Sequence, residues 1–301
     1  MSRILVVGAG VVGLTCAVRL LEAGHRVDVV ARDLPLETTS SLAAALWYPY
    51  RAAPQDRVLA WAERSYEVLA RLADEPAAGV RMRLGTEVFR APEPDPWWRG
   101  AVPGLDRETS LPSGFGDGWT FLSPVAEMPL YLRWLVSRVE GLGGTVTRLN
   151  LSALPTGAPL VVNASGIGSR LLAADQSVLP VRGQVVHVAQ VGLERWMLDV
   201  AGLTYVVPRS LDIVVGGTDQ EGEWSRTPDP AAAAAMLDRA RALVPELGAA
   251  RVLRHRVGLR PWGPQVRLER LGDIVHCYGH GGAGVTLSWG CADEVVRLVD
   301  S

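Results

Sequence analysis

A glycine-rich turn near the start of the chain constrains the fold more than any other feature. The apolar run 4–7 is typical of a buried parallel strand, and apolar residues at helical spacing follow over 14–21. Between them, Gly8 permits a tight turn, Gly10 lets the backbone approach a pyrophosphate, and Gly13 lets helix and strand pack closely. The segment predicts a dinucleotide site, against the alternative of a purely structural turn.

The next segment leaves the dinucleotide open. Residues 26–31 predict a second strand, and a ribose-binding acid is expected about 20 residues after the glycines. Asp33 fits that distance, with Arg32 directly before it. An arginine here suits either the 2′-phosphate of NADP or the adenosine of FAD, so both cofactors remain open.

The rest of the chain predicts an α/β fold with two domains. Helical spacing covers 56–75 and 129–140, and a short apolar strand over 160–163 indicates a return to the first sheet. A strand over 274–278, a glycine turn and a helix from Val285 form a second strand–turn–helix unit. The first domain is therefore Rossmann-like and discontinuous, and we assign to it residues 1–50, 141–184 and 255–301.

The second domain is predicted to be a mainly antiparallel sheet that binds the substrate, comprising residues 51–140 and 185–254. Its expected strands are 185–191, 203–207 and 213–217, covered by an alanine-rich helix over 230–244. The segment APEPDPWWRG at 91–100 is expected to be irregular and on the surface. The small and aromatic residues of AAALWYPYR suit backbone lying close to a flat ring, or else a plain buried loop.

Composition excludes several classes of function. The formal charge is −2 and no apolar stretch could cross a bilayer, so neither nucleic acid nor membrane is expected as a partner. The sequence contains no lysine, which removes pyridoxal-phosphate and P-loop chemistry and is typical of a GC-rich bacterial genome. Cys16, Cys277 and Cys291 lack metal-ligand spacing and are expected to be buried and reduced. No signal peptide precedes the first strand, so we expect a cytoplasmic protein.

These features coincide with the motifs of one family. From end to end the chain resembles the D-amino-acid oxidases and D-aspartate oxidases. The matching segments are VVGAGVVGL, AAALWYPY, DPWW, LVVNASG, PVRGQVV, GLTYVVP, VGLRPWGPQVRLER and YGHGGAGVTLSWG. The resemblance implies FAD rather than NADP, with the flavin ring against the N-terminus of the last helix. The positions that match cofactor-binding residues are Gly8, Gly10, Val11, Val12, Gly13, Arg32, Asp33, Thr39, Ser40, Ala44, Leu46, Gly166, Gly281, Gly284, Val285 and Thr286.

The resemblance also implies the chemistry. Arg260 matches the arginine that pairs with the amino-acid carboxylate, Tyr205 the tyrosine that hydrogen-bonds it, and Gly282 the residue whose carbonyl accepts from the amine. The implied reaction is oxidative deamination of D-amino acids to 2-oxo acids, ammonia and hydrogen peroxide. The Cα hydride passes to flavin N5 and molecular oxygen is the acceptor. No side-chain base is required when the amine binds neutral, so His280 is expected to be structural.

The chain departs from the eukaryotic pattern at the substrate. Its short 196–204 connection, with Ala201 where a second tyrosine would stand, implies a shortened lid of a bacterial type. Where aspartate oxidases carry further arginines, this chain has Leu198 and Asp219. A second carboxylate would be left unpaired there, so neutral D-amino acids are the expected substrates. The expected pocket walls are Trp47, Tyr48, Met197 and Val207.

Three rival readings remain. The first is an oxidase of glycine or sarcosine, and the second is a D-aspartate oxidase. The third is a catalytically silent flavin-binding protein that keeps only the fold, against which the retained Arg260 and Tyr205 argue. A homodimer is left open by the sequence.

Overall fold

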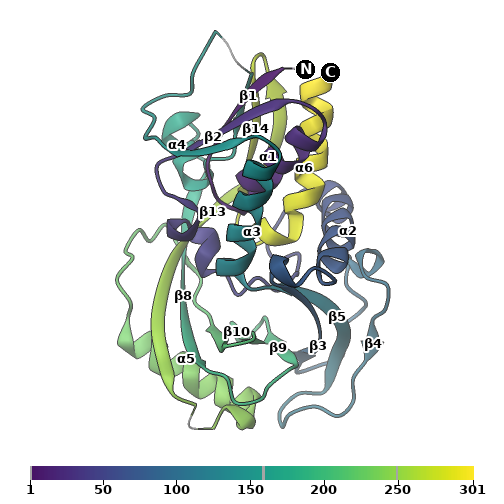
Figure 1. The fold of residues 1–301 in the computed structure, drawn as a ribbon. Coiled ribbons are helices and arrows are strands. Elements are labelled where there is room, and N and C mark those ends of the chain that lie inside the picture. The colour runs from purple at the N-terminus through teal and green to yellow at the C-terminus, as the bar shows by residue number, and fades with distance from the viewer. Residues whose placement is uncertain (1, 158–159, 249) are drawn as a thin grey trace.

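The computed structural model describes residues 2–157, 160–248 and 250–301, and its strands join into one continuous sheet. The strands follow each other in the order β4-β5-β3-β9-β10-β11-β8-β13-β14-β7-β1-β2-β6, with β12 beside β8. One end of the sheet is parallel and helix-covered and the other is mainly antiparallel, as Figure 1 shows at the top and bottom of the view. The predicted α/β fold class is confirmed.

The parallel end of the sheet carries the predicted nucleotide-binding unit. β1 lies between β2 and β7, and β14 and β6 extend the sheet in parallel on either side. The inner strands β1, β7 and β14 are mainly apolar and buried because helices cover them, whereas the edge strand β6 is polar and largely exposed. Their bounds are β1 Arg3–Val7, β2 Arg26–Ala31, β6 Thr145–Arg148, β7 Leu160–Asn163 and β14 Ile274–His280.

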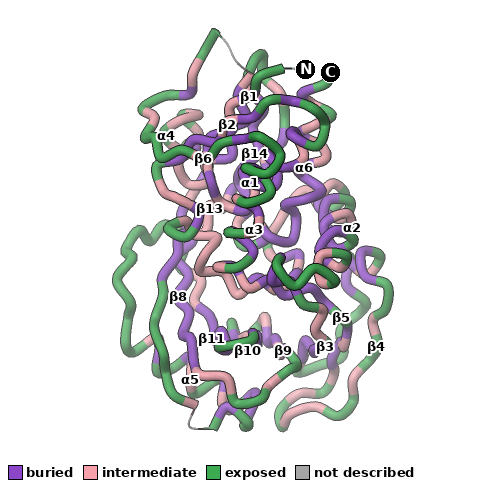
Figure 2. The backbone as a smooth tube through the Cα atoms, in the orientation of Figure 1, coloured by how far each residue is buried: buried purple, intermediate pink, exposed green. Residues whose placement is uncertain are grey.

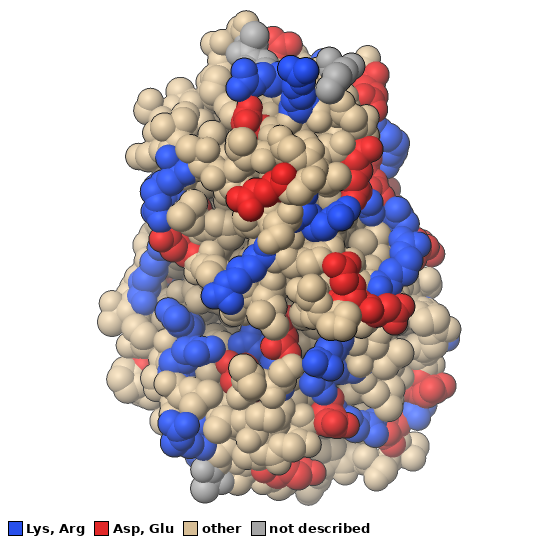
Figure 3. All heavy atoms as spheres, in the orientation of Figure 1, with Lys and Arg blue, Asp and Glu red and all other residues tan. Residues whose placement is uncertain are grey.

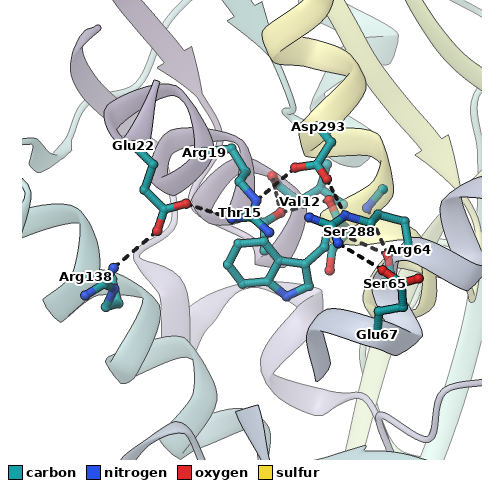
Figure 4. A network of polar contacts seen from close by, with 12 residues as sticks. Val12, Thr15, Arg19, Glu22, Arg64, Ser65, Glu67, Arg138, Ser288 and Asp293 are labelled. Atoms are coloured by element: carbon teal, nitrogen blue, oxygen red, sulfur yellow. Dashed lines mark hydrogen bonds and ion pairs between the residues drawn. The ribbon is translucent and has the colours of Figure 1, made fainter. Parts of the chain in front are cut away.

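Four helices pack around this end of the sheet: α1 contacts both α6 and α3, and α2 packs on α6. Figure 4 shows polar side chains that join them. Asp293 of α6 pairs with Arg19 of α1 at 2.9 Å and with Arg64 of α2 at 2.6 Å. Arg138 of α3 pairs with Glu22 of α1 at 3.2 Å. The helices are α1 Val11–Glu22, α2 Gln55–Leu72, α3 Met128–Gly141 and α6 Gly284–Asp300.

The antiparallel end holds a second hydrophobic core, where α5 packs against β8, β10 and β11. Its elements are β3 Val80–Phe89, β4 Asp106–Arg107, β5 Asp117–Ala126, β8 Leu179–Ala189, β9 Trp196–Asp199, β10 Thr204–Pro208, β11 Asp212–Gly216, β12 Gln220–Glu221, α5 Pro230–Leu243 and β13 Val252–Leu271. Short helices complete the chain: α4 Ser169–Leu172 and 3-10 turns at Pro35–Glu37, Thr39–Leu42, Pro76–Ala78, Arg99–Ala101, Gly166–Gly168 and Pro245–Leu247.

Two long strands join the ends of the sheet. β8 pairs with β13 from Val252 to Trp262, and β13 then continues alongside β14. β8 is buried along nearly its whole length (Figure 2). The predicted domain boundaries 184/185 and 254/255 fall inside these continuous strands, and the division into two domains stays a prediction.

Several expected elements differ from the structure. The 196–204 connection contains a strand, β9, because Trp196 packs in the core and this segment pairs with both β3 and β10. The 91–100 segment is irregular as predicted, but Trp98 is buried against Trp47 and Phe121 and is part of the core. In the described parts of the chain, no helix has the length and apolar character needed to cross a bilayer. Figure 3 shows acidic and basic side chains interspersed over one face.

Candidate active site

A cavity of about 730 Å³ lies between the two glycine turns and extends along β8, β10 and β13. Its volume is in the usual range for small-molecule and cofactor sites. It is lined by the turn at 8–12, the end of β2, the 37–46 segment, the end of β7 and the turn before α6. The cavity therefore sits at the carboxyl ends of the parallel strands, where open α/β sheets bind ligands.

The first glycine turn has the tight geometry that the sequence predicts. Gly8 has φ +118°, and a Cβ there would lie 2.3 Å from the carbonyl oxygen of Ala164. A Cβ on Gly13 would lie 2.0 Å from the carbonyl oxygen of Gly8. Neither position admits a side chain, so the turn packs directly against backbone, and Gly8 lines the cavity with backbone atoms alone.

Ser40 caps α1 across the cavity wall. Gly10, which precedes the helix, has no side chain with which to cap it. The Ser40 hydroxyl accepts a hydrogen bond of 3.0 Å from the Val11 N–H instead. Ser40 is thus at the helix N-terminus, where the helix dipole favours an anion.

The end of β2 presents a charge pair to the cavity. Arg32 Nη2 lies 2.6 Å from Asp33 Oδ2, and both residues line the cavity. Hydrogen bonds from Arg32 lower the pKa of the Asp33 carboxyl, so Asp33 is ionised at neutral pH. The structure brings both predicted residues to this point.

The second glycine turn places the N-terminus of α6 against the cavity. Gly281 has φ +55°, and Gly284 and Val285 begin the helix at the cavity wall. Ala283 precedes the helix and supplies no side-chain cap, so this end also faces the cavity with backbone groups. The other cavity-lining residues among those predicted to bind the cofactor are Gly8, Gly10, Val11, Val12, Thr39, Ser40, Ala44, Leu46 and Gly166; the predicted Gly13 does not line the cavity.

Thr286 does not line the cavity. Its side chain is buried, and its hydroxyl donates to the Tyr48 carbonyl oxygen at 3.0 Å and accepts from the Tyr48 N–H at 3.1 Å. Thr286 therefore connects α6 to the 43–50 segment, and its predicted flavin contact stays a prediction.

Arg260 lines the same cavity as the Arg32–Asp33 pair, at the end formed by β8 and β13. Its guanidinium rests on Gly183 of β8, where a Cβ would come within 2.4 Å of Cζ. One nitrogen donates to the Thr218 carbonyl oxygen at 3.0 Å. Among the described residues Arg260 has no carboxylate partner, and it lines the cavity. A half-buried guanidinium without a counter-ion is a strong site for a carboxylate.

Tyr205 and Gly282 adjoin this guanidinium. The Tyr205 ring lies on Gly216, where a Cβ would be 2.2 Å from Cζ. Burial raises the pKa of the Tyr205 hydroxyl and the charge of Arg260 opposes the shift, so the hydroxyl is protonated at neutral pH. A Cβ on Gly282 would lie 3.7 Å from Arg260 Cδ. The three predicted catalytic residues therefore meet at one end of one cavity.

The expected pocket walls are partly wrong. Of the four, Tyr48 and Val207 line the cavity, but Trp47 and Met197 do not. Trp47 is fully buried and donates to the Ala62 carbonyl oxygen at 3.0 Å, while Met197 packs against the second core.

Sequence reasoning missed a buried carboxyl group behind the cavity. The Tyr48 hydroxyl lies 2.9 Å from both oxygens of Glu87, whose side chain comes from β3. Burial raises the pKa of the Glu87 carboxyl to about 8. The sequence around Glu87 does not indicate a buried carboxyl group, because its hydrogen-bond partner Tyr48 is 39 positions away in the chain.

The three cysteines are buried and free, as predicted. The structure nevertheless brings Cys277 and Cys291 together with His280, with ligand atoms within 4.8 Å of one another. The spacing of these three residues in the sequence does not indicate that they lie close together. His280 is buried at the cavity wall, and its Nε2 has no hydrogen-bond partner among the residues described.

Comparison with known proteins gives consistent matches over the whole chain. The family model "DAO: FAD dependent oxidoreductase" matches residues 3–298. The chain is 54% identical to a D-amino-acid oxidase of Rubrobacter xylanophilus over 99% of this chain and 95% of that protein. It is 45% identical to a D-amino-acid oxidase of Streptomyces coelicolor, over 99% and 96%. The crystal structure of glycine oxidase from Geobacillus kaustophilus superposes with a TM-score of 0.86 at 20% identity, over 100% and 95% of the two chains.

Proposed function

The chain belongs to the DAO family of FAD-dependent oxidoreductases, and on that premise we propose that it deaminates neutral D-amino acids to 2-oxo acids, ammonia and hydrogen peroxide. The observation that carries this proposal is the guanidinium of Arg260, which faces the cavity without a carboxylate partner among the described side chains. Such a group calls for an anionic ligand, and an α-carboxylate fits its planar fork.

The shape of the cavity fits FAD. FAD is long and has a pyrophosphate near its centre, and its ring takes up negative charge when it is reduced. The cavity extends from the Arg32–Asp33 pair to Arg260, and the N-termini of both α1 and α6 face it. The N-terminus of α1 would hold the pyrophosphate, and that of α6 would adjoin the ring.

FAD supplies an electron-pair acceptor at N5 of its ring and returns the electrons to oxygen. The chain's own residues bind and orient the substrate. Arg260 and Tyr205 hold the carboxylate, and the Gly282 carbonyl accepts a hydrogen bond from the amine. These three contacts hold the carboxylate and the amine of the substrate, and so they orient its Cα–H bond. Orientation of the reacting bond provides a large share of the rate of a hydride transfer. The backbone N–H groups of α6 stabilise negative charge where it develops.

The same geometry disfavours acidic substrates. Leu198 and Asp219 line the cavity where a side-chain carboxylate would need a cationic partner. An apolar group and an acid leave a second carboxylate desolvated without compensation. D-Aspartate is therefore the weaker candidate substrate.

Anaerobic mixing with a panel of D- and L-amino acids tests the proposal, with bleaching of the flavin absorbance as the readout. We expect bleaching by D-alanine and D-phenylalanine, little with D-aspartate, glycine or sarcosine, and none with L-enantiomers. Arg260→Ala should raise the D-alanine concentration required by roughly 100-fold or more, and Arg260→Lys should rescue it only in part. Arg297→Ala, on the exposed end of α6, is the matched control.

A flavin that no amino acid bleaches would support the silent flavin protein instead. Bleaching by glycine and sarcosine alone would support the glycine-oxidase alternative. A cytoplasmic location and a homodimer belong to the same proposal, and subcellular fractionation and sedimentation velocity test them.

A further inference from the structure

The segment that connects β12 to α5, residues 222–229, is held in place by Arg182 of β8. Every residue of this segment is exposed, whereas Arg182 is buried. Arg182 Nε donates to the Ser225 carbonyl oxygen at 3.0 Å, and Nη2 donates to the Thr227 carbonyl oxygen at 2.6 Å. Nη1 donates to Gln220 Oε1 at 2.6 Å. One buried guanidinium therefore fixes the segment at two carbonyl groups and at the strand before it.

A second buried side chain of β8 fixes the end of the segment. Gln184 Nε2 donates to the Asp229 carbonyl oxygen at 2.8 Å, and Oε1 accepts from the Asp229 N–H at 2.7 Å. Gln184 is fully buried, and Asp229 directly precedes α5. Surface connections are usually mobile because few contacts fix them. This one is anchored to the sheet along its length, so the backbone between the anchors has a fixed position.

The anchored backbone places Arg226 at the cavity. Arg226 lies between the two residues whose carbonyl groups Arg182 holds, and it lines the cavity together with Trp224, which is 52% exposed. Arg182 itself does not line the cavity. No carboxylate pairs with Arg226 among the side chains that the structure describes. A surface arginine can be hydrated without a partner, but one that is held at the wall of a ligand cavity is available to an anion there.

Arg226 belongs to the adenosine end of the cavity. Hydrogen bonds from Arg32 are the main cause of the lowered pKa of the Asp33 carboxyl, and the charge of Arg226 lowers it further. Asp33 already has Arg32 as its partner at 2.6 Å. Arg148, whose charge also acts on Asp33, pairs with Glu37 at 2.7 Å. Arg226 is thus an additional positive charge at a point where these carboxylates are already paired.

We propose that Arg226 is a cofactor-binding residue whose guanidinium pairs with the diphosphate of FAD, and that Arg182 is the positioning residue that holds it there. The diphosphate is an anion beside the adenosine, and the planar guanidinium fork matches phosphate oxygens. The N-terminus of α1 faces the same cavity with backbone N–H groups, and Arg226 adds a full positive charge to them. The inference rests on the FAD binding that the proposed function requires, and not on the identity of the amino acid.

The rate at which the holoenzyme releases FAD tests the role of Arg226. After dilution, flavin fluorescence should rise roughly 5- to 20-fold faster in Arg226→Gln than in wild type, because one charge-assisted contact is lost. Arg226→Lys keeps the charge without the fork and should be intermediate. Arg195→Gln, at an exposed arginine that does not line the cavity, is the matched control and should release FAD at the wild-type rate.

Salt distinguishes a contact with phosphate from one with the adenine ring. At about 1 M salt the Debye length falls to about 3 Å, so the ratio of release rates between Arg226→Gln and wild type should shrink to about twofold or less. A ratio that stays unchanged would show that Arg226 stacks on the base, and would contradict the pairing with the diphosphate.

A double-mutant cycle tests the positioning role of Arg182. Arg182→Met removes the donors and nearly keeps the side-chain length, so it should speed FAD release by a factor similar to that of Arg226→Gln. In the Arg226→Gln background the same change should add less than about twofold, because both variants lose one interaction. Additive effects would contradict the positioning role. Gln184→Met, which frees the other anchor, tests the same coupling where Arg182→Met does not fold.

The release assay and the bleaching assay separate this inference from the proposed function. Release of FAD at the wild-type rate from Arg226→Gln, while D-alanine still bleaches the flavin, would overturn the inference and leave the proposed function intact. A bound flavin that no D-amino acid bleaches would contradict the proposed function, and the release rates would still test Arg226.

Discussion

At the scale of single residues, Gly183 controls the position of Arg260. A Cβ at this glycine would lie 2.4 Å from Arg260 Cζ and 2.5 Å from both terminal nitrogens. In Gly183→Ala the guanidinium must move, and a displacement of about 1 Å in a positioning group can cost about 100-fold in rate. We expect kcat/KM for D-alanine to fall by roughly that factor while FAD stays bound, measured by steady-state oxygen consumption and flavin absorbance. Gly100→Ala, with open space around it, is the control and should leave kcat/KM unchanged.

Glu87 makes stability depend on pH. Burial raises the pKa of its carboxyl from 4.5 to about 8 in the folded state. Below pH 4.5 the carboxyl is protonated in both states and carries no penalty. As the pH rises toward 8, only the unfolded chain releases the proton, so the free energy of unfolding falls.

Replacing Glu87 with Gln should remove this loss. We expect the fall in unfolding free energy between pH 5 and 8 to be smaller in Glu87→Gln by about 2–4 kcal/mol, measured by urea denaturation. Glu93→Gln, at an exposed position, should keep the wild-type slope. Parallel pH profiles for wild type and Glu87→Gln would show that this carboxyl is ionised when buried.

The site residues that the sequence indicated lie in contiguous motifs, whereas the ones it missed depend on contacts between residues far apart in the chain. GLRP, GLTY and the second glycine turn are contiguous motifs of the family that the chain resembles, so the resemblance could point to Arg260, Tyr205 and Gly282, and the structure places these three at one end of the cavity. The Tyr50–Asp219 hydrogen bond joins residues 169 positions apart, and no periodicity encodes such a pair. The sequence pointed to Asp219 only as an absence of arginine, and its hydrogen bond with Tyr50 could be seen only in the fold.

At the scale of elements, regular spacing predicted helices α2, α3 and α5 to within a few residues. β3 and β5 were missed, although they form a long antiparallel pair from Val80 to Phe89 and from Asp117 to Ala126. Their connection spans 27 residues, far longer than a hairpin turn, so no local turn signal marks it. β8 begins at Leu179, earlier than predicted, because residues 179–184 pair with β13 as well.

Thr286 has two candidate roles: it connects α6 to the 43–50 segment, or it contacts the flavin as the resemblance implies. A substitution can distinguish them. Its hydroxyl makes two hydrogen bonds to the Tyr48 backbone, so Thr286→Val should destabilise the protein by about 1–2 kcal/mol. If this connection is its main role, the affinity for FAD stays within about twofold, measured by fluorescence titration of the apoprotein. Thr286→Ser keeps the hydroxyl and should retain most of the stability. A large loss of FAD affinity in Thr286→Val alone would favour the flavin contact that the resemblance implies.

At the scale of the whole molecule, the shared strands β8 and β13 couple the two ends of the sheet. Hydrogen bonds run without interruption from β4 to β6, and β13 pairs with β8 at one end and with β14 at the other. A domain joined to its neighbour only by linkers can unfold separately, whereas one joined by continuous strands loses those hydrogen bonds when it separates.

We therefore expect a single cooperative unfolding transition. Trp98, Trp119 and Trp196 lie in the antiparallel end, whereas Trp61 and Trp289 lie on α2 and α6 at the parallel end. Tryptophan fluorescence therefore follows both ends, while flavin release follows the parallel end alone. In urea, both signals should share one midpoint, and added FAD should shift both together because it binds only the folded state. A biphasic tryptophan signal, with one phase insensitive to FAD and separate from flavin release, would mean that β8 and β13 break between the predicted domains. The boundaries at 184/185 and 254/255 would then describe physical units despite the continuous strands that cross them.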